Sequence, residues 1–276
     1  MKNLHKKIKP QFNERADSAL KWTKFKGHDV HIVEAGNPSS IDLLAKAYKD
    51  VYEPAFPIAE ERETMSSLLS GLDGTDSGLG NIVIAIISDN INTTDPAIKG
   101  IVVGYYYHKE DVGLLAYTAT APEYRNQGLG HIQVEILGQA FLRMAKKNGG
   151  KLGGYFLECN DPLKVKPEED SFDPATRIKI FQKWGAKIMP IDYVQPPLEA
   201  GAKKCTSLKL LAYPHPETGK YPTLEAIKGF VRGIYTALIR YSGIFLQADP
   251  DYVRMMQQID ALAATRKPPA HKPPTP

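Results

Sequence analysis

Cysteine is scarce in this chain of 276 residues, which contains only Cys159 and Cys205. Two cysteines cannot form a disulfide framework, and they cannot build a structural metal site by themselves. Cys159 ends the apolar run Tyr155–Cys159, a setting typical of a buried free thiol rather than of a nucleophile. The sequence therefore gives no reason to expect thiol catalysis or a bound metal ion.

Long hydrophobic runs are missing as well. The longest apolar stretch, Ile82–Ile87, is far too short to span a bilayer, and no apolar segment typical of a secretory signal follows the N-terminal charges. Those charges, Lys2, Lys6, Lys7 and Lys9, have no interleaved aromatic motif, and the net charge is only +4. The sequence predicts a cytoplasmic protein that binds neither membranes nor nucleic acid.

The rest of the composition is that of an ordinary globular protein, so most of the chain is expected to fold. Changes in composition suggest a polar N-terminal extension (1–26), an α/β domain (27–214), a helical extension (215–265) and a disordered Pro- and Lys-rich tail (266–276). The helical extension carries an apolar stripe that must be buried. Its partner is the chain's own α/β domain, which we favour, a second copy in a homodimer, or the substrate site, over which it would form a lid.

The most informative stretch runs from Thr118 to Gly130. An apolar strand pattern breaks at Pro122, and the chain then passes through Arg125-x-x-Gly128-x-Gly130 into an amphipathic helix. Glycines let the backbone approach a ligand closely, and the first N–H groups of a helix have no partner within it. This order of elements predicts a phosphate-binding loop at a helix N-terminus.

Two other phosphate-binding motifs fit this stretch less well. A P-loop needs Lys followed by Ser or Thr after its last glycine, whereas His131 and Ile132 follow Gly130 here. A dinucleotide-binding fingerprint needs Gly-x-Gly-x-x-Gly, of which only the second and third glycines could be matched.

The stretch resembles the acyl-CoA loop of the GNAT superfamily of N-acyltransferases, whose pattern Arg/Gln-x-x-Gly-x-Gly/Ala is met at Arg125, Gly128 and Gly130. Neighbouring segments follow in the order that the superfamily shows, and the resemblance spans roughly residues 28–213. These segments are a strand at Leu114–Thr120, a helix at Gln133–Lys147, a strand at Tyr155–Cys159, and a further helix with its closing glycine within Arg177–Ala186.

The resemblance implies an α/β (α+β) fold with a mixed, mostly antiparallel central sheet flanked by helices, here followed by a C-terminal helical extension. It also implies that the sheet is splayed at the acyl-CoA site, where separated strands expose backbone groups to the pantetheine arm. The residues that the resemblance implies for acyl-CoA binding are Thr118, Ala119, Thr120, Arg125, Asn126, Gln127, Gly128, Leu129, Gly130, His131 and Phe181.

Catalysis is less clearly marked. The family often supplies a tyrosine, four residues before the glycine of its second motif, to protonate the departing thiolate, and Phe181 stands at that position. Phenylalanine has no proton to give. Glu158 and Tyr193 are the candidate catalytic replacements, Tyr117 is a third that alternation turns away from the cleft, and water is another proton carrier. The structural alternatives are an ion pair for Glu158 and packing in a turn for Tyr193.

The resemblance implies an N-acyltransferase that moves an acetyl group from acetyl-CoA to a primary amine, by direct attack in a ternary complex and without a metal. The acceptor, a small-molecule or peptide amine, is left open, and a homodimer through the C-terminal helices is possible. Two alternatives remain: an acyl-CoA-binding sensor or scaffold without turnover, which Phe181 favours, and an acyltransferase that uses a longer acyl chain.

Overall fold

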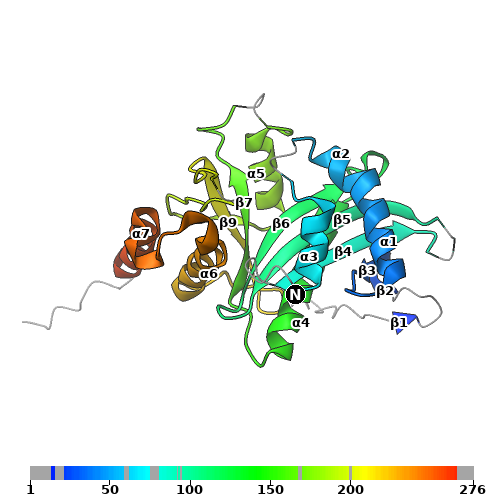
Figure 1. Ribbon diagram of the computed structural model, residues 1–276, viewed down its shortest axis with the longest axis horizontal. Helices are drawn as coiled ribbons and strands as arrows, with labels where there is room; N and C mark the ends of the chain where they lie inside the picture. Colours follow the sequence, from blue (N-terminus) through cyan, green and yellow to red (C-terminus); the bar gives the residue numbers. More distant parts are fainter. Residues whose placement is uncertain are drawn as a thin grey trace, which may run out of the picture.

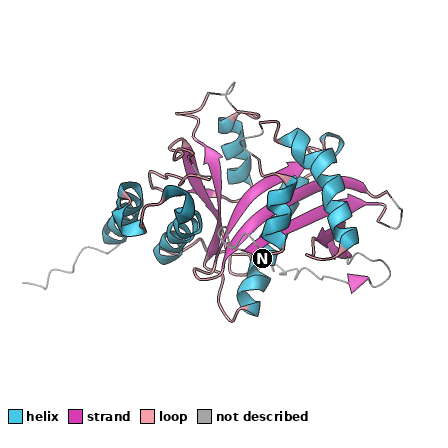
Figure 2. Cartoon of the chain, viewed as in Figure 1, coloured by secondary structure: helices cyan, strands magenta, loops and turns pink. Residues whose placement is uncertain are grey.

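The computed structural model describes residues 14–15, 22–58, 62–74, 81–91, 93, 95–166, 170–198 and 201–265. Within these residues the strands form one sheet in the order β1-β2-β3-β4-β5-β6-β7-β9-β8 (Figures 1 and 2). Their bounds are β1 Glu14–Arg15, β2 Trp22–Phe25, β3 His28–Ile32, β4 Asn81–Asp89, β5 Ala97–Tyr107, β6 Val112–Thr120, β7 Gly154–Asn160, β8 Lys187–Ile188 and β9 Leu208–Tyr213.

Helices connect and cover these strands. The α-helices are α1 Pro38–Ala47, α2 Glu53–Ala55, α3 Met65–Leu72, α4 Leu129–Lys147, α5 Pro174–Lys183, α6 Leu224–Ser242 and α7 Pro250–Thr265. A π-helical turn, η1 Tyr48–Tyr52, joins α1 to α2, and two 3₁₀ turns are η3 Pro122–Tyr124 and η5 Leu246–Ala248. None of the helices in these described parts has the length and apolarity that crossing a bilayer requires.

Most neighbouring strands of the sheet are antiparallel, as predicted. The strands β4 and β5 form the long antiparallel pair on either side of the polar loop that begins after Asp89. The exception is β6 with β7, which run parallel because α4 crosses between them. The mixed, mostly antiparallel sheet flanked by helices confirms the predicted fold class.

Two apolar cores lie on opposite faces of the sheet. Side chains of α1, α3 and α6 pack with one face, where Leu44, Leu68 and Phe230 are fully buried. The helices α4 and α5 cover the other face, where Phe141 of α4 is fully buried. The fold is thus three layers, helices on sheet on helices, and alternation along each strand supplies both cores.

The C-terminal helix α6 packs on the chain's own sheet. Phe230 of α6 stacks on Phe156 of β7 with ring centroids 4.6 Å apart, and the Tyr235 hydroxyl donates to the Val194 carbonyl over 3.0 Å. Figure 1 shows α6 next to the part of the sheet formed by β7 and β9, with α7 on the outer side of α6. The apolar stripe is therefore buried within the chain, so it no longer supplies a reason to expect a homodimer.

The N-terminal extension contributes a strand that the sequence analysis did not predict. Trp22–Phe25 pairs antiparallel with β3 across the turn Lys26-Gly27, and both turn residues have positive φ, 48° and 87°. This turn geometry suits the twist of a hairpin. The polar composition of this segment suggested an extension outside the domain. A strand near the edge of a sheet keeps one face in water, so a polar composition is compatible with a strand as well. The predicted tail, 266–276, lies outside the described residues.

Candidate acyl-CoA and amine site

The parallel strands β6 and β7 separate halfway along their length. They pair over Val112–Leu115 and Gly154–Leu157, and the pairing stops there. On its other side, β6 changes register with β5 between Val103↔Tyr117 and Gly104↔Leu115, which leaves Ala116 as an extra residue. Such a bulge bends a strand, and here it coincides with the point at which β6 leaves β7.

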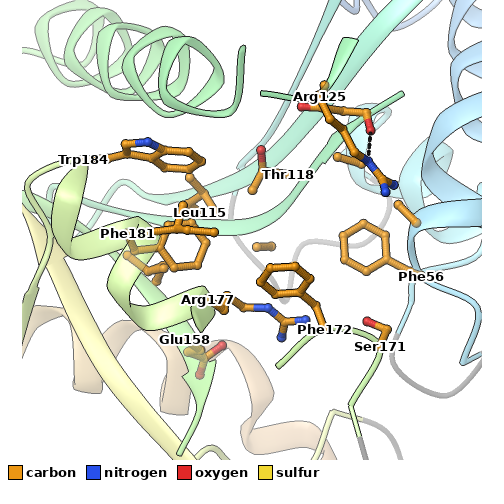
Figure 3. Close-up of a pocket in the computed structure, with 16 residues that line it drawn as sticks. Phe56, Leu115, Thr118, Arg125, Glu158, Ser171, Phe172, Arg177, Phe181 and Trp184 are labelled. Carbon is orange, nitrogen blue, oxygen red and sulfur yellow. Dashed lines mark hydrogen bonds between the residues drawn. The ribbon is translucent and has the colours of Figure 1, made fainter. Parts of the chain in front are cut away.

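A cavity of about 380 Å³ opens at this separation. Its volume lies within the range of small-molecule sites in proteins. Figure 3 shows its side chains arriving from both strands, from α5 and from the loops around them. The residues that line it are Ala55, Phe56, Leu115, Ala116, Thr118, Ala119, Thr120, Arg125, Leu157, Glu158, Ser171, Phe172, Arg177, Ile180, Phe181 and Trp184.

The predicted phosphate loop lies beside this cavity, between β6 and α4. Gly128 precedes α4 with φ 79°, a left-handed conformation that glycine adopts without strain. The hydrogen bond from Ile132 N to the Gly128 carbonyl (3.2 Å) opens the helix ladder, so the amides of Leu129, Gly130 and His131 precede that ladder. The helix N-terminus therefore presents backbone donors and positive dipole charge to an anion.

Gly130 is required for a different reason. A Cβ atom at this position would lie 2.4 Å from the ring of Trp184, a separation that real contacts do not allow. The Trp184 ring also stacks on His131, with 6.0 Å between centroids, and meets the Phe181 ring edge-on. The second glycine of the motif thus lets the start of α4 approach the aromatic wall of the cavity.

A buried glutamine, Gln133, fixes α4 to the strand beside the cavity. Its amide nitrogen donates to the Ala119 carbonyl (2.7 Å), and its amide oxygen accepts from the hydroxyls of Thr118 (2.8 Å) and Thr120 (3.3 Å). Gln133 is fully buried. Both threonines line the cavity as predicted, but these hydroxyls are directed to Gln133, a residue that the sequence analysis did not identify.

Glu158 and Tyr193, the two candidate catalytic residues, are in direct contact. The Tyr193 hydroxyl donates to Glu158 Oε1 over 2.5 Å, and the Gln195 amide donates to Oε2 over 2.8 Å. Burial raises the pKa of Glu158 to about 7, even though both hydrogen bonds oppose this shift. Glu158 lines the cavity. Tyr193 does not line it and is only 2% exposed, so it contacts Glu158 from the buried side.

Comparison with known proteins identifies the fold. No protein-family model and no curated protein sequence matches the chain. Among solved structures, a Bacteroides thetaiotaomicron protein assigned to the GNAT family of acetyltransferases is similar over 78% of this chain and 99% of its own, with a TM-score of 0.53 and 18% identity. The chain has the GNAT fold.

Two further solved structures give lower TM-scores. The ribosomal-protein-S18-alanine N-acetyltransferase of Escherichia coli is 12% identical, with a TM-score of 0.41, over 69% of this chain and 96% of its own. The PaiA N-acetyltransferase of Thermoplasma acidophilum, solved with coenzyme A, is also 12% identical with a TM-score of 0.41, over 67% of this chain and 98% of its own.

On the GNAT fold of this chain, the residues predicted to bind acyl-CoA fall into two groups. One group lines the cavity directly, namely Thr118, Ala119, Thr120, Arg125 and Phe181. The other group forms the loop and helix start beside it, namely Asn126, Gln127, Gly128, Leu129, Gly130 and His131. Within the second group the Leu129 side chain is buried in the core, so its backbone amide alone faces outward.

Phe181 stands at the sequence position where the resemblance suggested a tyrosine. It is on α5, lines the cavity and is 8% exposed, but it packs edge-on against Trp184 and carries no hydroxyl. Across the described part of the chain, no group of three or more His, Cys, Asp or Glu side chains is arranged to hold a metal ion. Among the described residues that line the cavity, Glu158 is the one that carries a carboxylate.

Arg177 is held at the cavity by a buried ion pair that the sequence analysis missed. Its guanidinium donates to both carboxylate oxygens of Asp170, over 2.8 and 3.0 Å, and the Asn160 amide donates to the same carboxylate over 2.8 Å. The Asp170 side chain is 1% exposed. Although burial works against the charge, the hydrogen bonds and the Arg177 charge hold the pKa of Asp170 below its usual value.

Proposed function

We propose that the protein is an N-acyltransferase that moves an acetyl group from acetyl-CoA to a primary amine. The observation that carries this proposal is the position of Glu158 in a cavity that opens where β6 and β7 separate, beside the phosphate loop. A donor bound at the loop by its pyrophosphate could extend its pantetheine arm along β6 toward that carboxylate.

Arg125 and the start of α4 support donor binding. The Arg125 side chain lines the cavity and donates from Nε to the Thr120 carbonyl over 3.3 Å. This hydrogen bond does not use the two terminal nitrogens of the guanidinium group. Figure 3 shows this hydrogen bond at the edge of the cavity. A guanidinium beside outward-facing helix amides is a suitable receptor for a pyrophosphate.

Glu158 would act as the general base. An amine reaches the site as an ammonium ion, and a carboxylate with a pKa of about 7 can accept its proton near neutral pH. The neutral nitrogen then attacks the thioester carbon, a C–N bond forms, and the C–S bond breaks as the tetrahedral intermediate collapses. The second nitrogen proton leaves through water, the departing thiolate takes up a proton from water to become the CoA thiol, and Glu158 returns its proton to solvent. The reaction is then complete without a covalent enzyme intermediate.

The alternative of a sensor that binds acyl-CoA without turnover is favoured by Phe181 alone, because this residue cannot protonate the thiolate. A thiolate can leave without a general acid when its conjugate thiol has a pKa near 8 to 9, roughly that of a free cysteine. Loss of the tyrosine therefore does not by itself remove catalysis.

The test is calorimetric titration with acetyl-CoA, combined with an assay of free thiol release against primary amines. Gly128→Trp places an indole over the phosphate loop, where a Cβ atom would meet no other atom within 4 Å, and it should abolish acetyl-CoA binding. Gly149→Trp is the matched control, because Gly149 has a similar φ of 74° and equally open surroundings at the other end of α4. Failure of the native protein to bind acetyl-CoA would overturn the proposal, and binding without thiol release from any amine would favour the sensor.

A further inference from the structure

The segment between β7 and α5 supplies one wall of the cavity. Ser171 and Phe172 both line it, and Phe172 remains 46% exposed. In Figure 3 the Phe172 ring lies on the side of the cavity away from Trp184, near Arg177 and Ser171. An exposed aromatic ring at the mouth of a cavity is a feature of ligand sites, where its apolar surface becomes covered on binding.

The buried Asp170–Arg177 ion pair holds Phe172 in this position. The Phe172 amide donates to Asp170 Oδ1 over 3.2 Å, and the Arg177 guanidinium lies 5.8 Å from the centre of the Phe172 ring. The same carboxylate binds the Arg177 guanidinium through both of its oxygens. Phe172 is thus exposed to the cavity but fixed at its backbone, which lowers the entropy cost of a contact with a ligand.

A second phenylalanine, Phe56, lines the cavity from a distant part of the chain. It follows α2 and packs into a group of rings, with its centroid 5.1 Å from Tyr52 and 5.2 Å from Tyr117. Tyr52 and Tyr117 also meet each other edge-on at 5.2 Å. Phe56 is therefore fixed by its neighbours, and it contributes a second apolar surface to the cavity.

Charge in the cavity points away from a polycationic acceptor. Among the described residues that line it, Glu158 is the only carboxylate, while Arg125 and Arg177 are cations. Two acidic side chains of the nearby helical region already have partners: Glu53 pairs with Arg62 over 2.7 Å, and the Glu63 carboxylate accepts from Ser67 over 2.8 Å. A molecule with several ammonium groups would find a single unpaired carboxylate here, beside the Arg125 guanidinium and an Arg177 guanidinium already paired with Asp170.

We propose that the acceptor is a primary amine with an uncharged aromatic body, whose ring lies against Phe56 and Phe172 while its amino group reaches Glu158. This inference rests on the proposed acyltransferase function and specifies its substrate class. Aromatic rings fit against the rigid Phe56 and the anchored Phe172, and a single ammonium group matches the single carboxylate. Ser171, beside Phe172, offers a hydroxyl to a polar substituent on the ring.

The experiment measures thiol release from acetyl-CoA with 2-phenylethylamine, n-hexylamine and spermidine as acceptors. We expect 2-phenylethylamine to give the highest kcat/KM, and we expect Phe172→Ala to raise its KM by about tenfold with little change in kcat, because the contact is made before the chemical step. The same substitution should change KM for n-hexylamine less. Leu163→Ala is the matched control, since Leu163 is 89% exposed in the same segment and does not line the cavity.

The outcomes separate this inference from the proposed function. Faster turnover of spermidine than of 2-phenylethylamine, or a Phe172→Ala variant with unchanged KM, would overturn the aromatic acceptor and leave the acyltransferase intact. If no amine releases thiol, calorimetry with 2-phenylethylamine and spermidine on the protein saturated with CoA decides the acceptor separately. Binding of 2-phenylethylamine that weakens about tenfold in Phe172→Ala supports it, and preferential binding of spermidine or binding of neither overturns it.

Discussion

The Tyr193 hydroxyl donates a hydrogen bond of 2.5 Å to the carboxylate of Glu158. Tyr193 is buried behind the cavity, and burial, followed by the nearby Glu158 charge, raises its own pKa well above the usual value. It therefore keeps its proton at any pH at which the protein would work. In the proposed acyltransferase, Tyr193 would be a positioning residue that holds Glu158 through this hydrogen bond, and Glu158 would be the group that faces an incoming amine.

Glu158→Gln should remove the pH dependence that the carboxylate confers. If Glu158 is the general base, kcat/KM of the native protein rises as pH increases through about 7, because only the ionised carboxylate accepts a proton. In Glu158→Gln this rise should disappear and kcat should fall by about 10²-fold or more. Glu135→Gln is the control, since Glu135 pairs with Lys26 on the surface of α4. A Glu158→Gln variant with native kcat and an unchanged profile would contradict the assignment.

Tyr193→Phe tests the hydrogen bond itself. The Tyr193 hydroxyl lowers the pKa of Glu158 against the larger effect of burial, so its removal should move the rising part of the pH profile to higher pH. At a pH well above this transition, kcat should recover toward the native value, because the base is then ionised again. A Tyr193→Phe variant that loses activity equally at every pH would instead identify Tyr193 as a direct proton donor.

Gly130→Ala and Gly128→Ala should have different effects, although both glycines belong to the same motif. A methyl group at Gly130 would lie 2.4 Å from the Trp184 ring, so we expect a loss of about 1–3 kcal/mol in unfolding free energy and at least tenfold weaker acetyl-CoA binding. Gly128→Ala meets no atom within 4 Å but is strained by φ 79°, which costs about 1 kcal/mol. Urea denaturation and calorimetry measure both effects. Equal weakening of acetyl-CoA binding by the two variants would show that the Trp184 contact is not what places the loop.

The loop between β6 and α4 was predictable from the sequence because its determinants are local. A strand that ends before Pro122, the glycines at 128 and 130 and the amphipathic repeat after them predicted a helix over Gln133–Lys147. The structure starts this helix one turn earlier, at Leu129, directly after Gly128. The alternation along β6 also gave the correct faces, since Thr118 contacts Gln133 of α4 while Tyr117 packs against Tyr52 on the opposite side.

The residues that the sequence did not reveal depend on contacts across long chain separations. Gln133 looks like an ordinary polar position on a helix, and only the fold shows that it is fully buried against β6. The contact between Glu158 and Tyr193 joins β7 to the segment after β8, and no periodic pattern predicts it. Asp170 belongs to a loop whose sequence shows only that it is long. Its buried ion pair with Arg177 can be identified only once the position of α5, which carries Arg177, is known.

Arg177→Gln should destabilise the fold more than loss of the whole ion pair does. It leaves the Asp170 carboxylate, 1% exposed, without its cation, at a cost of about 3 kcal/mol in unfolding free energy. The double variant Asp170→Asn/Arg177→Gln should recover part of that loss, because an amide replaces the unpaired charge.

Since the folded pKa of Asp170 is lowered, the contribution of the native pair to the unfolding free energy is present above the ordinary carboxyl range and is lost as pH falls through the folded pKa. Urea denaturation of the three proteins at neutral and acidic pH measures both effects. A double variant as unstable as Arg177→Gln at neutral pH would mean that the cost lies in lost packing rather than in the unpaired charge.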